Sequence, residues 1–218
     1  MSILKKTNDF SDRFTRIAPV AKFLSLVFKV LTYVSAVLAA LLLVVAFVLV
    51  FVDVGVDDLL FTPHMDKVSD GRYALSLGNG IEIVPNKTIG TDHIKGAAYS
   101  GIFTLFAILL VCVPIFGFLG KLMKNVGKKE PLSVENAMLV NYIGLCITVG
   151  TPLVLLVKQF FNYKLVSIFV DEKVVFNPSI DVYGILLGVF IMIVGTIYGY
   201  ACSMHKKETA LILSNRDD

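Results

Sequence analysis

Four long apolar stretches without a charged residue constrain the fold of this chain more than any other feature. They are Val30–Val52, Ala98–Gly120, Ala137–Val157 and Val182–Ser203, and none contains Asp, Glu, Lys, Arg or His. A helix of about 20 apolar residues crosses the roughly 30 Å hydrocarbon core of a bilayer. The remaining chain is too short to cover four such helices in a soluble core. The sequence therefore predicts an integral membrane protein with a four-transmembrane-helix bundle.

The composition agrees with a membrane protein, because only 17% of the 218 residues are charged and soluble domains average about 25%. The first apolar stretch is not expected to be a cleaved signal peptide. A polar segment of almost thirty residues precedes it, and it is longer than the roughly 7–15 apolar residues of a signal sequence. We expect it to be retained as the first membrane helix.

The distribution of Lys and Arg predicts the orientation in the membrane. Segments 1–29, 121–136 and 204–218 carry thirteen of the 20 Lys and Arg residues, and segments 53–97 and 158–181 carry seven. Cytoplasmic segments are enriched in these residues. Both termini are therefore expected in the cytoplasm. The basic inner face suits anionic lipids, so nucleic acid is not needed to explain it.

The N-terminal segment 1–29 has the pattern of a basic amphipathic helix. From Asp9 to Lys29 its apolar residues recur every three or four positions, and basic residues flank them. This pattern is typical of a helix that lies on the membrane surface. A partner-binding helix is the alternative. Pro19 is expected to bend or to break the segment.

Both loops on the outer side contain strand-like patterns. In the first loop, residues 73–77 and 81–84 flank Gly78-Asn79-Gly80, which is typical of a hairpin. In the second loop, residues 165–170 and 174–176 flank a charged turn. Single hairpins are marginal in water. We therefore predict one small β-sheet cap that takes strands from both loops.

Four glycines of the last apolar stretch fall on one narrow face of a helix. Gly184, Gly188, Gly195 and Gly199 are spaced by 4, 7 and 4 residues. Small residues at such spacing let a second helix approach closely within a membrane. The face is interpreted as a packing surface inside the bundle, with Ser35/Ala39 or Ala36/Ala40 as its partner. A docking surface for another membrane protein, or for a second copy, is the alternative.

Polar groups inside the apolar stretches are few. Asn141 lies deep in the third stretch and Asn136 near its inner end; such amides form interhelical hydrogen bonds or line a ligand pocket. Pumps and proton relays generally use charged groups in the membrane, so an autonomous transporter is disfavoured. A neutral polar path is the alternative, and its expected lining is Asn141, Pro114, Pro152, Tyr183, Tyr198 and Tyr200.

No catalytic or metal-binding motif stands out. His64, Asp66 and His93 share the first outer loop and are weak metal candidates without ligand spacing. Cys-x-x-Cys, Gly-x-Ser-x-Gly and phosphate-binding glycine loops are absent from the sequence. We therefore expect neither an enzyme nor a cofactor.

The inner loop and the start of the third stretch carry a short motif, which consists of Gly127, Pro131, Ser133, Asn136, Ile143 and Gly144. It resembles the central segment of the DUF2975 family of uncharacterised bacterial four-helix membrane proteins. Leu132 stands where that family usually has Phe. The resemblance implies a bacterial cytoplasmic membrane protein and brings no established activity. The order of helices and loops is also claudin-like, but in architecture only, because the chain lacks Trp and outer-loop Cys.

These observations favour a non-enzymatic accessory or regulatory membrane protein that binds a protein or an extracytoplasmic peptide. An immunity or envelope-stress protein is a specific version of this hypothesis. The alternative function is a channel or transporter component with a neutral path. Homo-oligomers are compatible with both hypotheses.

Overall fold

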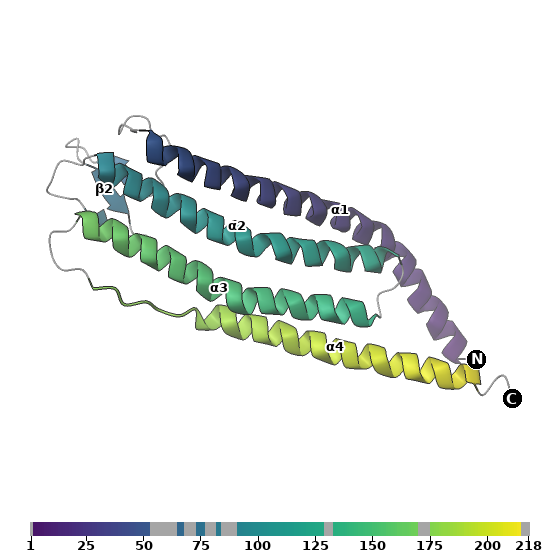
Figure 1. Ribbon diagram of the computed structural model, residues 1–218. Coiled ribbons are helices and arrows are strands. Elements are labelled where there is room, and N and C mark those ends of the chain that lie inside the picture. The colour runs from purple at the N-terminus through teal and green to yellow at the C-terminus, as the bar shows by residue number, and fades with distance from the viewer. Residues whose placement is uncertain are drawn as a thin grey trace. The chain divides into compact units, whose positions relative to one another are not determined.

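A computed structural model describes residues 2–52, 65–67, 73–76, 82–83, 91–128, 133–169 and 175–214. Within these residues the chain forms four long helices and three short strands (Figure 1). The helices are α1 (Ser2–Phe51), α2 (Thr91–Gly127), α3 (Val134–Phe169) and α4 (Val182–Ser214). The strands are β1 (Met65–Lys67), β2 (Tyr73–Ser76) and β3 (Glu82–Ile83).

Each of the four helices contains a segment long and apolar enough to cross a membrane. The segments are Ile17–Phe51, Ala98–Gly127, Val134–Lys164 and Val182–Glu208. No more than 17% of the most apolar window of any of them is buried within the protein. Most of the apolar side chains therefore need lipid as their surroundings. These are the helices of a multi-pass membrane protein.

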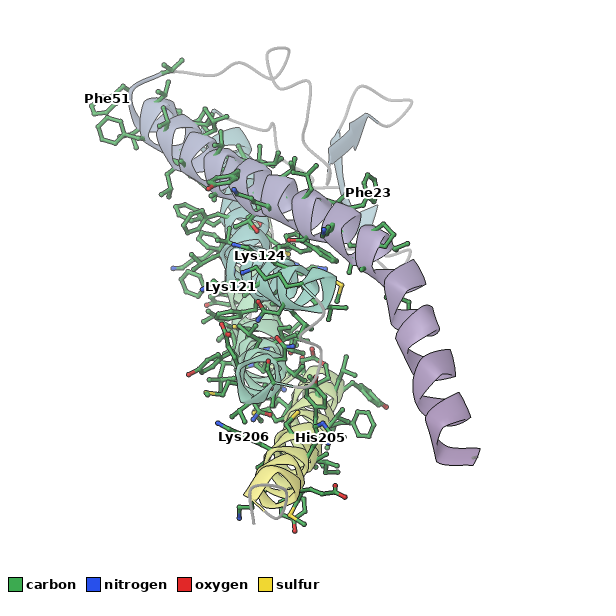
Figure 2. All side chains as sticks on the ribbon, turned by 90° about the vertical axis from the view of Figure 1, so that its right-hand side faces the viewer. Phe23, Phe51, Lys121, Lys124, His205 and Lys206 are labelled. Atoms are coloured by element: carbon green, nitrogen blue, oxygen red, sulfur yellow. The ribbon has the colours of Figure 1, made fainter. Side chains whose placement is uncertain are left out.

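Helix α1 continues through the segment that was expected to form a separate surface helix. It is unbroken from Ser2 to Phe51 with Pro19 inside, and Figure 2 shows it changing direction close to Phe23, about one turn after this proline. A proline inside a helix removes one backbone hydrogen bond and bends the helix. Ala18 and Ala21 are buried. The segment is therefore continuous with the first membrane helix, and its residues after Pro19 pack against α2. The bend expected at Pro19 is confirmed, and the location of the segment on the membrane surface stays a prediction.

The three strands of the described β-sheet all come from the first loop. Its strand order is β1-β2-β3, all antiparallel. Leu75 pairs with Met65 on one side and with Ile83 on the other. The pairing of 73–77 with 81–84 that the sequence predicted is confirmed for residues 75–76 and 82–83, and the Gly78-Asn79-Gly80 turn lies outside the described residues.

The strands expected in the second loop are a wrong prediction. Residues 165–169 continue α3, and residues 175–181 belong to no strand. The β-branched and aromatic residues there favour a strand locally. Extending an existing helix needs no new nucleation, however, and this outweighs a weak strand preference. The sheet therefore receives no strand from the described part of the second loop.

The chain divides into two compact units, and each is described by itself. Unit 1 comprises Met1–Ser35, Val111–Thr151 and Val182–Asp218. Unit 2 comprises Ala36–Leu110 and Pro152–Asp181. Helix α4 therefore belongs to unit 1, whereas α1, α2 and α3 each contribute to both units.

In unit 1, α3 and α4 meet backbone to backbone at two glycines. A Cβ on Gly188 would lie 2.6 Å from the carbonyl oxygen of Gly144 and 2.5 Å from the amide nitrogen of Thr148. A Cβ on Gly144 would lie 2.7 Å from the carbonyl oxygen of Gly188. These are backbone atoms, which cannot move aside cheaply. Only glycine fits this crossing at either position.

We expect Gly188→Ala to lower the free energy of unfolding by about 1–3 kcal/mol, because the added methyl overlaps the backbone of α3. Unfolding of the purified chain in detergent measures the change. Gly101→Ala on α2 is the matched control, since a Cβ there has no neighbour within 4 Å. Equal stability of the two variants would contradict the close crossing.

Candidate functional site

The glycine face of α4 is covered by α3 at three of its four positions. Gly188 faces Thr148, Gly195 faces Asn141, and a Cβ on Gly199 would lie 3.1 Å from the Cβ of Ala137. Gly184 lies in the first turn of α4. For these three glycines the neighbour is α3, where the sequence suggested small residues of the first stretch. The three covered glycines are unavailable to a partner protein unless α4 leaves α3.

The contact of Asn141 with α4 differs from the amide clamp that the sequence suggested. Its Oδ1 atom is buried, has no hydrogen-bond donor among the described residues and would contact a Cβ on Gly195. The Cα–H of a glycine is a weak donor that partly satisfies a carbonyl oxygen. Asn141 therefore packs against the α4 backbone at Gly195.

Asn136 is the centre of a polar cluster in unit 1. Its side chain is fully buried, and its Oδ1 accepts a 2.8 Å hydrogen bond from Nδ2 of Asn125 near the end of α2. Tyr198 of α4 also forms a side-chain hydrogen bond with Asn136. One buried amide thus joins α2, α3 and α4 next to the loop between α2 and α3.

The motif residues around Asn136 have structural contacts. The Asn136 amide nitrogen donates a 3.2 Å hydrogen bond to Oγ of Ser133, which is the N-cap of α3 that the sequence predicted. Ile143 is buried, Gly144 forms the crossing with α4, and Gly127 lies against Lys22, whose Cγ would be 2.8 Å from an added Cβ. Pro131 lies outside the described residues.

A cavity of about 660 Å³ in unit 1 is a second candidate site. It lies between α1 and α2. We call it the lysine pocket, and it is lined by Lys22, Ser25, Leu26, Lys29, Thr32, Tyr33, Phe116, Gly117, Gly120, Lys121, Lys124 and Lys128. Figure 2 shows Lys121 and Lys124 together near the end of α2. Close packing of Phe28 on Phe116, with ring centroids 6.3 Å apart, holds α1 and α2 together beside it.

Two of the hydroxyl groups that line the lysine pocket already donate to backbone oxygens. Ser25 Oγ donates to the carbonyl oxygen of Gly120 at 2.9 Å, which links α1 to α2. Thr32 Oγ1 donates to the carbonyl oxygen of Phe28 at 2.8 Å. The five ammonium groups therefore dominate the chemistry of the pocket. This chemistry suits an anion.

A smaller hollow of about 290 Å³ lies in unit 2 beside the second loop. We call it the aromatic hollow, and it is lined by Gln159, Asn162, Tyr163, Val166, Val175, Phe176 and Asn177. The Phe176 ring lies 5.2 Å from that of Tyr163 and 6.4 Å from that of Phe160. Aromatic pairs at such distances contribute beyond the area that they bury. The loop segment is thereby docked on α3.

The side chain of Gln159 holds the loop segment through hydrogen bonds to Ser179. Its Nε2 donates to the carbonyl oxygen of Ser179 at 3.2 Å and to Oγ of Ser179 at 2.6 Å. The Ser179 amide donates back to Oε1 of Gln159 at 2.9 Å. This pairing imitates a strand neighbour, although the segment belongs to no sheet.

The weak metal candidates gain no geometric support. His64 lies outside the described residues, Asp66 belongs to β1, and His93 lies in the first turn of α2. Among the residues searched, no group of three His, Cys, Asp or Glu could hold a metal ion.

No family model, curated protein or solved structure matches this chain. Its function must therefore be argued from its own sites.

Sequence reasoning missed the lysine pocket because it used the lysines to orient the chain and to indicate a basic inner face, and it did not pair the two helices that carry them. Lys22 and Lys29 are seven residues apart, and Lys121, Lys124 and Lys128 follow three- and four-residue steps. Each set lies on one helical face. That periodicity was a usable signal, but the contact between the two faces could not be read from it.

We expect Asn125→Ala and Asn136→Ala to be coupled by about 1 kcal/mol in a double-mutant cycle of unfolding, because their side chains are direct hydrogen-bond partners. Asn125→Ala combined with Thr196→Ala is the control, since Thr196 is exposed and bonded within its own helix. Additive effects of the two asparagine substitutions would contradict the buried bond.

Proposed function

We propose that this chain is a non-enzymatic accessory or regulatory membrane protein that acts by binding a protein or peptide partner. The observation that supports this proposal most is the loop segment 175–181. Gln159 holds this segment against α3 by hydrogen bonds, while the apolar side chains of the segment stay exposed. A held segment loses little conformational freedom when a partner binds.

The chemistry of the segment indicates the kind of partner. Val175 is 76% exposed and Ile180 is 65% exposed, and the aromatic hollow lies next to Val175. Within the described residues, the main chain of residues 175–180 makes no hydrogen bond to another main chain. An extended peptide with apolar side chains could pair with its main chain and fill the hollow.

The setting of the proposal is a bacterial cytoplasmic membrane with both termini inside. The Lys and Arg distribution supports this orientation, and the DUF2975 resemblance, which stays a prediction, supports the source. The 175–181 segment would then face outward. An immunity or envelope-stress protein that meets a toxin or peptide outside the cell is the specific form of the proposal.

The alternative is a channel or transporter component. Of its expected lining, Tyr183 is 87% exposed and Tyr200 is 68% exposed, whereas Asn141 packs on Gly195. Neither the lysine pocket nor the aromatic hollow includes any of these residues. The described geometry therefore gives a neutral path less support than it gives to partner binding.

Site-specific photocrosslinking in native membranes tests the proposal. We expect a photoreactive residue at Val175 to trap one defined protein or peptide, and Gln159→Ala to reduce that product several-fold by releasing the segment. Ser167→Ala is the matched control, because Ser167 Oγ only donates to the carbonyl oxygen of Lys164 on the same helix.

A photoreactive residue at Phe47 on α1, which is 66% exposed, reports background contacts. Binding through this segment would be contradicted if Val175 and Phe47 gave the same crosslinked products. It would also be contradicted if Gln159→Ala left the yield of the Val175 product unchanged.

A further inference from the structure

Among the described residues that line it, the lysine pocket carries positive charge only. Five of its twelve lining residues are Lys, and none is Asp or Glu. None of the five lysines forms an ion pair with a described residue. Like charges around one cavity repel one another, and an anion in the cavity would remove that repulsion.

The pocket is also amphipathic. Leu26, Tyr33 and Phe116 supply apolar wall beside the lysines. Val30 begins the uncharged stretch of α1 and Gly120 ends that of α2. The lysines thus lie at the boundary between uncharged and charged chain on both helices. Lipid phosphates occupy this boundary at a membrane surface, and their acyl chains extend along the apolar side.

We propose that the lysine pocket binds the headgroup of an anionic phospholipid. The phosphate lies among the five ammonium groups, and the acyl chains follow the apolar wall. Because five lysines exceed the single charge of one phosphodiester, a headgroup with two phosphates binds more tightly than a headgroup with one. A soluble phosphate is also an anion but leaves the apolar wall uncovered, so it binds more weakly than the lipid.

Native mass spectrometry of the purified full chain measures this binding directly. The chain is titrated with phosphatidylcholine, phosphatidylglycerol and diphosphatidylglycerol, and the affinity is expected to rise in that order. The double variant Lys29→Gln with Lys121→Gln is expected to lower the affinity for diphosphatidylglycerol about tenfold. The control is Lys206→Gln with Lys207→Gln, which removes the same charge from exposed positions of α4 outside the pocket. Figure 2 shows Lys206 on α4.

A steric variant tests the pocket without changing its charge. Gly117 lines the pocket, and a Cβ there would meet nothing within 4 Å. We expect Gly117→Leu to reduce lipid affinity several-fold while the unfolding temperature stays that of the parent chain. Gly101→Leu is the matched control, since Gly101 is equally unobstructed and lies outside the pocket.

Competition with inorganic phosphate and with glycerol phosphate shows whether the ligand of the pocket is a lipid or a soluble anion. Displacement of lipid by either soluble compound at concentrations equal to that of the lipid would overturn the assignment to a lipid. Two results would overturn the pocket itself. One is an equal loss of lipid affinity in the pocket double variant and in the α4 double variant, and the other is an affinity for phosphatidylcholine equal to that for diphosphatidylglycerol.

Discussion

The close backbone contact between α3 and α4 is the interaction on which unit 1 depends. Inside a bilayer, lipid is as apolar as Leu, so burying apolar surface drives helices together only weakly. Attraction must come from close packing and from polar contacts. Gly144 and Gly188 bring the two backbones within contact distance, and this approach sets Asn141 against Gly195. The same pairing of helices lets Tyr198 reach Asn136.

The other polar contacts between segments lie near the ends of the apolar stretches, where water and headgroups can satisfy polar groups. In unit 1, Asn125 and Asn136 form their hydrogen bond beside the loop between α2 and α3, and the lysine pocket lies along the same end of α2. In unit 2, Gln159 fixes an extended segment beside the aromatic hollow. The proposed lipid site and the proposed partner site are therefore separate features of separate units. The loss of one site need not remove the other.

The sequence predicted what depends on composition and short-range pattern. The length of the uncharged stretches predicted the four apolar helices, and Ser133 indicated the start of α3. The alternation of apolar and polar residues around Gly78–Gly80 predicted the β2–β3 pairing. It failed where tertiary context outweighed local preference. Residues 165–169 have strand character but extend α3. The α4 glycines contact α3, and the lysines of α1 and α2 line one pocket. Both are contacts between segments distant in the sequence, and periodicity alone does not specify such contacts.

The proposed orientation of the helices is the central claim, because it would place the lysine pocket at the inner leaflet and the 175–181 segment outside. Accessibility of single cysteines in intact cells tests it most directly, after Cys112, Cys146 and Cys202 are replaced by Ser. A membrane-impermeant thiol reagent should label a cysteine at Val175 in intact cells, and one at Lys128 only after permeabilisation. Labelling of both positions in intact cells, or of Lys128 alone, would contradict the account.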